Sequence, residues 1–149
     1  MSYFIVFQNK TYDEEKREGI LWAPKKTKAG GEIYHWSNIT KIKEGDIIFS
    51  VYKRKIVSLN TAKGKCESCN RPQSLDSVNL WEKEGWVVNV HYEALDNPVN
   101  INDNISEILR LCPSKYSPFT KTGKGNQGYL FEISNELGEY IIKLIKDIN

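Results

Sequence analysis

Two apolar runs joined by a basic turn dominate the hydrophobic pattern of the chain, between residues 44 and 62. The first run is 47–51, the turn carries Lys53, Arg54 and Lys55, and the second run is 56–59. β-Branched and aromatic residues in runs of this length, bounded by turn residues, favour strands over helices. The pattern therefore predicts two buried strands that place Ser50 and Tyr52 at one end of a sheet, beside three cations.

The remaining pattern predicts a mixture of short strands and short helices. Further strands are expected at 3–7, 86–92 and 129–133, and a brief apolar segment at 20–24. Helical spacing predicts helices at 13–18, 34–42 and 101–111, and a final helix capped by Ser134. Residues 63–79 are expected to form a long polar loop. Asn97-Pro98 is expected to end the strand that includes 86–92. The sum is an α+β domain spanning 1–149, with five or six strands in a curved, partly closed barrel and helices beside it.

Composition is ordinary for a globular domain, but the charges are segregated. The chain has 149 residues, a net charge of +2 and 27% charged residues. Residues 53–71 hold six basic side chains against one acid, and 111–131 hold three lysines and no acid. A basic face suits nucleic acid, although chance clustering on a solvated surface is the alternative. The candidate contacts to a nucleic-acid backbone are Lys25, Lys26, Lys53, Arg54, Lys55, Lys121 and Lys124.

Several other classes of protein are not favoured by the sequence. There is no signal-peptide pattern and no apolar run of about 18 residues, so a cytoplasmic protein with no membrane partner is expected. Cys66 and Cys69 have metal-ligand spacing, but a second pair is missing, which favours two loop thiols over a zinc site. The acids of 13–15 are expected on a solvated helix face. No triad, nucleophile elbow or carboxylate cluster is present, so neither catalysis nor a cofactor is predicted.

The segment 123–128 matches the dinucleotide-binding pattern Gly-x-Gly-x-x-Gly letter by letter. That pattern binds phosphate only between a strand and a helix, whereas here a strand is expected to follow. The dinucleotide interpretation is therefore rejected. A flexible loop whose backbone amides and lysines approach a phosphate is kept as a weaker alternative.

The tryptophans are the sharper signal. Trp22 stands between Gly19 and Pro24 in a loop-like stretch, and Trp81 stands just before a predicted strand. Two such rings at the rim of a curved sheet could sandwich a planar base, although they could equally cover the core. Trp36 and Trp86 lie in periodic segments, which favours the core for both.

Short motifs in this order resemble the opening of a YTH domain. They are the strand 3–7, the segment Gly19-Ile20-Leu21-Trp22 and the strand 46–51, followed by Trp81 and the strand 86–92. His35-Trp36 with the stretch 43–46 is similar to EVE domains of the same PUA-like superfamily. Over its full length the chain looks most like the SRA-like domain found ahead of HNH nucleases in McrA-type restriction enzymes.

This resemblance implies a pocket for a modified base that is flipped out of a duplex or taken from a single strand. The expected ligand is a modified cytosine in duplex DNA. By motif position the candidate base contacts are Trp22, Trp81, Tyr52, Ser50, Asn9 and Trp36. The chain departs from the YTH pattern at Ala23-Pro24, where a Ser-Thr pair is expected, which leaves the identity of the base open. The expected function is a non-catalytic DNA-binding specificity module that targets a fused or associated nuclease. The alternatives are a YTH-like reader of methylated adenine in RNA or DNA, and an enzyme acting on a base or small molecule.

Overall fold

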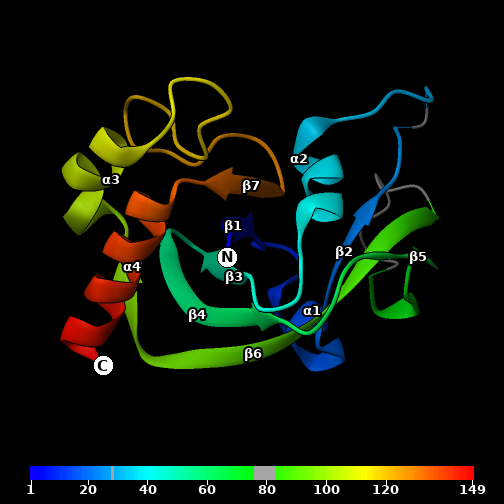
Figure 1. The fold of residues 1–149 in the computed structure, drawn as a ribbon, viewed down its shortest axis with the longest axis horizontal. Helices are drawn as coiled ribbons and strands as arrows, with labels where there is room; N and C mark the ends of the chain where they lie inside the picture. Colours follow the sequence, from blue (N-terminus) through cyan, green and yellow to red (C-terminus); the bar gives the residue numbers. More distant parts are fainter. Residues whose placement is uncertain (28, 76–82) are drawn as a thin grey trace.

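A curled sheet of seven strands forms the frame of the molecule (Figure 1). The computed structural model describes residues 1–27, 29–75 and 83–149. Its strands are β1 (Tyr3–Phe7), β2 (Ile20–Pro24), β3 (Ile47–Tyr52), β4 (Lys55–Ala62), β5 (Glu67–Asn70), β6 (Glu84–Asn100) and β7 (Leu130–Ile133). They lie in the order β2-β6-β4-β3-β1-β7, and β5 pairs with β6. Only β1 and β3 are parallel among these pairings, so the sheet is mixed, as the absence of strict strand–helix alternation predicts.

In the described part of the chain, four α-helices and three short 3-10 turns accompany the strands. The helices are α1 (Tyr12–Glu18), α2 (Tyr34–Ser37), α3 (Ile105–Leu111) and α4 (Asn135–Ile148), and the turns are η1 (Asn38–Lys41), η2 (Gln73–Leu75) and η3 (Asn102–Asn104). Ser134 caps α4, because its hydroxyl oxygen accepts a hydrogen bond from the Leu137 amide at 3.1 Å, as predicted. None of the helices in the described ranges is long and apolar enough to cross a membrane.

Alternation along the strands divides the apolar side chains between the two faces of the sheet. In β1, Tyr3 and Ile5 join the cluster that packs against α3 and α4, whereas Phe4 and Val6 join the cluster on the opposite face. Figure 1 shows α3 and α4 at one end of the long axis, with α1, α2 and β2 at the other. The predicted α+β architecture with a half-closed barrel is confirmed.

Two predicted boundaries are wrong for local reasons. The strand expected to stop at Asn97-Pro98 runs on to Asn100 in β6. Between the pairs Ile56–Val99 and Ser58–Ala94 the register shifts, so Pro98 falls in the irregular part of the ladder and needs no amide donor there. The polar stretch expected to be only a loop contains β5, which pairs with the first residues of β6.

The helix predicted over residues 34–42 is also interrupted. It consists of the single turn α2 followed by the 3-10 turn η1. Ser37 does not cap it, because its hydroxyl donates back to the Tyr34 carbonyl at 3.3 Å. A side-chain contact fixes this turn, since the Tyr129 amide donates to Nδ1 of His35 at 3.1 Å and ties α2 to the start of β7.

Candidate functional site

A buried carboxyl group organises the interior of the sheet next to α1. Glu15 is fully buried and receives hydrogen bonds from Gln8 Nε2 at 3.0 Å, Thr11 Oγ1 at 2.6 Å and the Trp22 amide at 2.9 Å, and also from the Tyr129 hydroxyl. Burial raises the pKa of Glu15 from 4.5 to about 7, against the opposing effect of its hydrogen bonds. The prediction of a solvated acidic face is therefore wrong for Glu15, which joins α1 to β2 and β7.

The same network takes up Ser50. Its hydroxyl donates to Gln8 Oε1 at 2.5 Å and accepts from Asn60 Nδ2 at 2.8 Å, and the side chain is fully buried. Ser58 completes the chain by donating to Asn60 Oδ1 at 2.7 Å. In this structure Ser50 therefore cannot reach a base edge. Ser50 lies in the second half of β3, and its side chain points into the interior.

The basic turn between β3 and β4 is strained. Tyr52 pairs with Lys55, so Lys53 and Arg54 form a two-residue hairpin connection with φ values of 49° and 64°. Positive φ at both positions is the type I′ geometry, which favours Asn-Gly and is costly for lysine and arginine. Asn9 holds the turn, since its Oδ1 accepts from the Lys53 amide at 2.8 Å. Two cations kept where smaller residues fit better indicate a functional role for their charge.

We expect the double change Lys53→Asn and Arg54→Gly to stabilise the protein. Removing two side chains from left-handed backbone should raise the free energy of unfolding by about 1 kcal/mol, measured by urea denaturation. Affinity for any nucleic acid should fall with the loss of two cations, and so should its salt dependence. Unchanged affinity in a more stable variant would show that the charges of this turn do not serve binding.

A cavity of about 300 Å³ opens beside this turn. Asn9 and Arg54 line it together with Phe7, Phe119 and the glycine-rich segment 123–128. The two phenylalanine rings meet edge to face at 5.8 Å and form an aromatic floor. The guanidinium of Arg54 pairs with no carboxylate among the described residues, and the amide nitrogen of Asn9 donates to none of them. The cavity thus offers an aromatic surface with polar groups at its rim.

The glycine and proline near Trp22 suggested a loop, but Trp22 does not lie in one. It lies in the middle of β2 with its ring fully buried beside Leu75, and its indole N–H donates to the Cys69 carbonyl at 2.9 Å. Gly85 makes room for the ring, because a Cβ there would lie 2.2 Å from Trp22 Cζ2. A base could stack on the Trp22 ring only if the side chains packed against it, Leu75 among them, moved away. Trp81, the other predicted wall, lies outside the described residues.

The other two aromatic candidates lie apart from the cavity. Tyr52 is half-buried and stacks on Tyr12 with ring centroids 5.8 Å apart. Trp36 is half-buried and packs against the apolar cluster that contains Phe4 and Val6, here called the inner cluster, as its periodic segment predicted. Of the five predicted base contacts that fall within the described residues, Asn9 alone lines this cavity.

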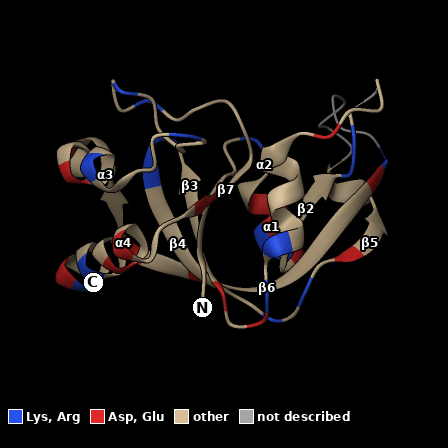
Figure 2. Cartoon of the chain, turned by 45° about the horizontal axis from the view of Figure 1, so that its top comes forward, with Lys and Arg blue, Asp and Glu red and all other residues tan. Residues whose placement is uncertain are grey.

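The predicted backbone contacts fall into two groups at opposite ends of the molecule (Figures 1 and 2). The turn 53–55 and the segment holding Lys121 and Lys124 lie toward the end with α3 and α4. Lys25 and Lys26 follow β2 and line a separate hollow of about 620 Å³. The Lys25 ammonium already makes two contacts within the protein. It lies 4.3 Å from the Trp86 ring centroid and donates a hydrogen bond to the Ser68 hydroxyl.

The glycine-rich segment is followed by β7 and not by a helix, so the dinucleotide interpretation remains rejected. Three of its six backbone amides are already hydrogen-bonded within the protein. Those of Gly123 and Asn126 donate to the carbonyls of Thr120 and Pro118 at 2.9 Å, and that of Lys124 donates to the Thr120 hydroxyl at 3.2 Å. The amides of Gly125, Gln127 and Gly128 have no such partner among the described residues, so they remain candidates for a phosphate contact together with the lysines.

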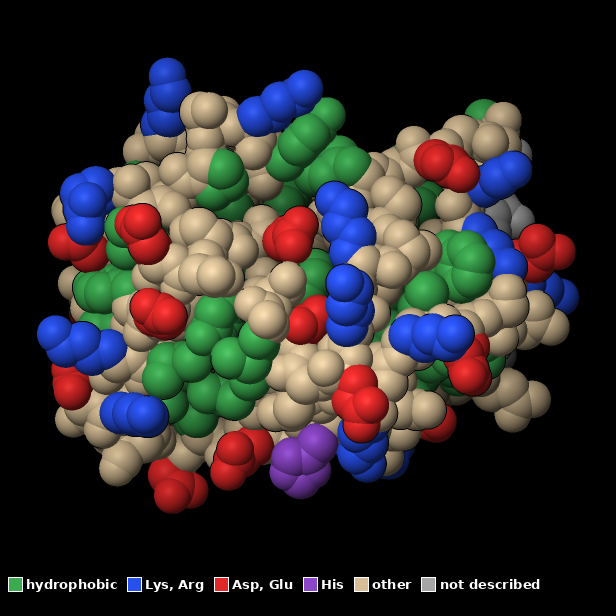
Figure 3. Space-filling view, viewed as in Figure 1, with side chains coloured by type: hydrophobic (Ala, Val, Ile, Leu, Met, Phe, Trp, Pro, Cys, Tyr) green, Lys and Arg blue, Asp and Glu red, His purple; other side chains and the backbone are tan. Residues whose placement is uncertain are grey.

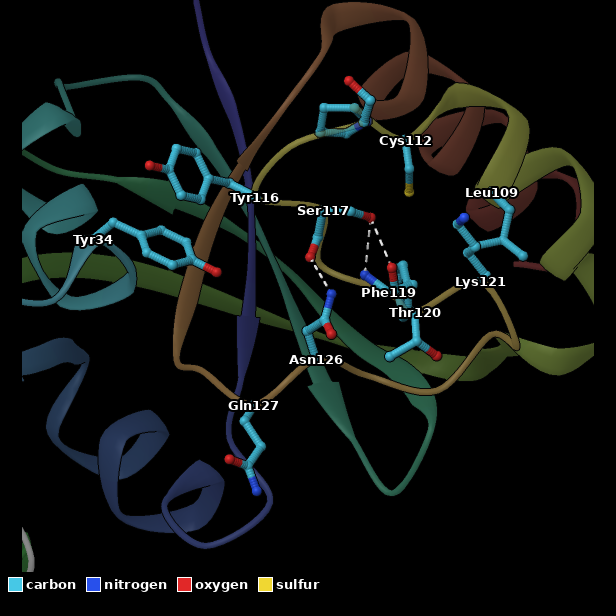
Figure 4. A pocket seen from close by; sticks show the side chains of 12 residues that line it. Tyr34, Leu109, Cys112, Tyr116, Ser117, Phe119, Thr120, Lys121, Asn126 and Gln127 are labelled. Atoms are coloured by element: carbon cyan, nitrogen blue, oxygen red, sulfur yellow. Dashed lines mark hydrogen bonds between the residues drawn. The ribbon is translucent and has the colours of Figure 1, made fainter.

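A second hollow, which the sequence did not indicate, lies next to the cavity. It is a cleft of about 780 Å³ whose walls include Tyr34 of α2 and Tyr116 of the segment between α3 and β7 (Figure 4). The nearest sequence signal was the acid-free stretch 111–131, which was interpreted only for its charge. Two segments this far apart in the chain could not be paired from the pattern alone.

The cysteines form no recognisable metal site. Cys66, Cys69 and Cys112 are all free thiols and half-buried. Within 1–27, 29–75 and 83–149, no three histidine, cysteine or acidic side chains are grouped closely enough to hold a metal ion.

Comparison with known proteins gives structural matches only. No family model and no curated protein matches the sequence. The Pho92 YTH domain, solved in complex with m6A, matches 97% of this chain and 86% of its own, with a TM-score of 0.65 and 13% identity. Human THYN1, solved with DNA containing 5-methylcytosine, matches 98% of both chains, with a TM-score of 0.61 and 12% identity. The YTH domain of Zygosaccharomyces rouxii MRB1, solved with N6-methyladenosine RNA, has a TM-score of 0.59 and 13% identity over 97% of this chain and 86% of its own.

These matches extend over nearly the whole chain, but their sequence identities are low. They therefore bear on the fold and do not assign a ligand. The chain has the PUA-like fold that YTH domains and THYN1 share.

Proposed function

We propose that this domain recognises a modified nucleobase in nucleic acid and that the base enters the cavity beside Asn9 and Arg54. The observation that carries the proposal is the fold, shared over nearly the full length with domains solved bound to methylated nucleotides. The domain would act as a binding module, without catalysis of its own.

The chemistry of the cavity supports a base as the occupant. Its volume of about 300 Å³ lies at the lower end of small-ligand sites, and Phe7 and Phe119 offer a surface on which a planar ring can pack. The amide of Asn9 can donate to a base acceptor, and the guanidinium of Arg54 supplies two parallel donors to an acceptor edge or a phosphate. A methyl group that fills the apolar part gains about 0.8 kcal/mol, enough for modest discrimination against the unmodified base.

The cations around the cavity would bind the backbone. Lys53, Arg54 and Lys55 approach from the turn, and Lys121 and Lys124 from the segment that forms the opposite wall. All five side chains lie at the surface, where they can pair with phosphates and release counterions. Affinity should therefore fall steeply as salt is raised.

For the identity of the ligand we propose a modified cytosine in DNA. The match to THYN1 favours this choice, and the resemblance to SRA-like domains of McrA-type restriction enzymes extends it to a fused or associated nuclease as partner. The YTH matches, both solved with methylated adenine, favour the second candidate, a reader of methyladenine in RNA.

The test is a binding panel of matched oligonucleotides. It holds duplex DNA with 5-methylcytosine, 5-hydroxymethylcytosine, glucosylated cytosine or N6-methyladenine, and RNA with N6-methyladenosine, each beside its unmodified counterpart. A preference for one modified DNA over its counterpart is expected. A stronger preference for the modified RNA would select the second candidate, and product formation with divalent metal would select an enzyme.

Single variants locate the site. Asn9→Ala should remove the preference for the modified base. A smaller loss of affinity for the unmodified oligonucleotide should accompany it, because Asn9 also holds the turn that carries Lys53 and Arg54. If Asn9→Ala keeps the preference and Trp81→Ala loses it, the base binds in the aromatic cage predicted from the sequence and not in this cavity.

A further inference from the structure

The cleft of Figure 4 carries an exposed pair of aromatic side chains. Tyr34 and Tyr116 have 36% and 54% of their surfaces exposed, and their ring centroids are 4.3 Å apart at an interplanar angle of 37°. Figure 4 shows both rings on one wall, with Leu109 and Lys121 on the other. Large aromatic side chains left this exposed mark binding surfaces more often than structural ones.

The backbone holds Tyr116 in place at a cost. Its φ of 59° lies in the left-handed region, which bulky residues rarely adopt. The segment around it is fixed by local bonds, including Asn126 Nδ2 to the Ser117 carbonyl at 2.6 Å and the Ser117 hydroxyl to the Phe119 carbonyl at 2.8 Å. Strain that surrounding bonds maintain at an exposed aromatic residue points to a function for the ring.

Charge indicates the kind of ligand. Lys115 places its ammonium 4.9 Å from the centroid of the Tyr116 ring, Lys121 lines the cleft, and residues 111–131 contain no acid. Figure 3 shows basic and hydrophobic side chains together along this edge of the molecule, over the segment between α3 and β7. Stacked aromatic rings beside cations form a surface suited to unpaired nucleotides.

The cleft also adjoins the cavity beside Asn9. Phe119, Asn126 and Gln127 line both hollows, so a ligand in one borders on the other. Gln127 is exposed, and its side chain makes no hydrogen bond to another described residue. A chain of nucleotides could therefore place one base in the cavity and its neighbour in the cleft.

We propose that the cleft binds the nucleotide next to the modified base. The base of this neighbouring nucleotide stacks on the Tyr34–Tyr116 pair, and its phosphate lies near Lys121. This inference rests on the proposed function and adds a second subsite to it. It implies that the neighbouring nucleotide also leaves the base stack, so that the domain engages a short unpaired stretch.

The test removes the ring from the protein and the base from the ligand. Tyr116→Asn deletes the ring while keeping a residue that tolerates positive φ, and Tyr116→Phe is the matched control that keeps the ring. The probes are single-stranded oligodeoxynucleotides with a central 5-methylcytosine or cytosine, flanked on each side either by thymine or by an abasic position. Fluorescence anisotropy gives the affinity of each protein for each probe.

Tyr116→Asn should weaken binding of the thymine-flanked probes by about tenfold, and Tyr116→Phe should leave it within about twofold. For the abasic probes the Asn variant and the wild type should bind alike. Equal losses on thymine-flanked and abasic probes would show that the ring contacts no neighbouring base and would overturn the inference, as would no loss at all.

The two proposals fail separately in this design. The ratio between 5-methylcytosine and cytosine probes in the wild type reports on modified-base recognition and should not change in Tyr116→Asn. An aromatic effect without any such ratio would retain the cleft as a nucleotide site while removing this modification from the proposed function. A wild type that binds no probe at any salt concentration would overturn the second subsite, and the duplex and RNA panel would then decide the proposed function alone.

Discussion

Replacing Trp22 by alanine is expected to lower the free energy of unfolding by about 3–5 kcal/mol. The Trp22 ring is fully buried and packs beside Leu75, and the missing side chain of Gly85 leaves the space that the ring fills. Its removal leaves a cavity and takes the indole donor away from the Cys69 carbonyl. Urea denaturation measures the loss directly.

Two matched variants sharpen this prediction. Trp36→Ala removes a half-buried ring at the edge of the inner cluster and should cost clearly less. Trp22→Phe keeps most of the packing and deletes the indole donor, so its cost should be about 1–2 kcal/mol. If Trp22→Ala unfolds at the same urea concentration as the wild type, the buried placement of Trp22 is wrong and an exposed cage wall becomes the better account.

The second large effect is a pH dependence of stability carried by Glu15. Its pKa is about 7 in the folded protein and 4.5 without burial. Because the pKa is raised in the folded state, protonated Glu15 contributes to the free energy of unfolding. This contribution is fully present below pH 4.5 and is lost as the pH rises through 7. The size of this contribution is on the order of 3 kcal/mol.

Glu15→Gln provides the comparison, since its amide does not titrate. The free energy of unfolding of wild type and variant should be measured at several pH values between 4.5 and 8. The difference between the two proteins should change by on the order of 3 kcal/mol across this range, in the direction that weakens the wild type at high pH. Burial lowers the pKa of His35, whose opposite contribution is present in both proteins and cancels. A difference that stays constant with pH would show that Glu15 is ionised throughout.

The apolar pattern was sufficient to predict most of the frame of this fold. Runs of β-branched residues marked β1, β3, β4 and β7, and a capping serine marked the start of α4, because burial on one or two faces dictates the residue types directly. The pattern failed where tertiary contacts decide. Pro98 lies inside β6 because a register shift leaves it without a ladder bond to make.

The candidate site was predicted less completely, for the same physical reason. Glu15 looks like its solvated neighbours in the sequence, and the donors from Gln8, Thr11, Trp22 and Tyr129 make its burial tolerable. The cavity brings Asn9 to Arg54 and to a loop more than a hundred residues away, which no local pattern encodes. The basic turn was recognised from its charge, but its strain is visible only in the backbone angles.

The most direct test of the account is the ratio of two affinities in one competition experiment. A duplex with a single 5-methylcytosine competes with the identical unmodified duplex for the wild-type protein and for Asn9→Ala at one salt concentration. We predict that the wild type prefers the modified duplex by about four- to fivefold, since a buried methyl group contributes about 0.8–1 kcal/mol, and that Asn9→Ala binds both equally. Equal affinities in the wild type here, together with no preference for any other modified oligonucleotide of the panel, would contradict the proposal that this domain recognises a modified base.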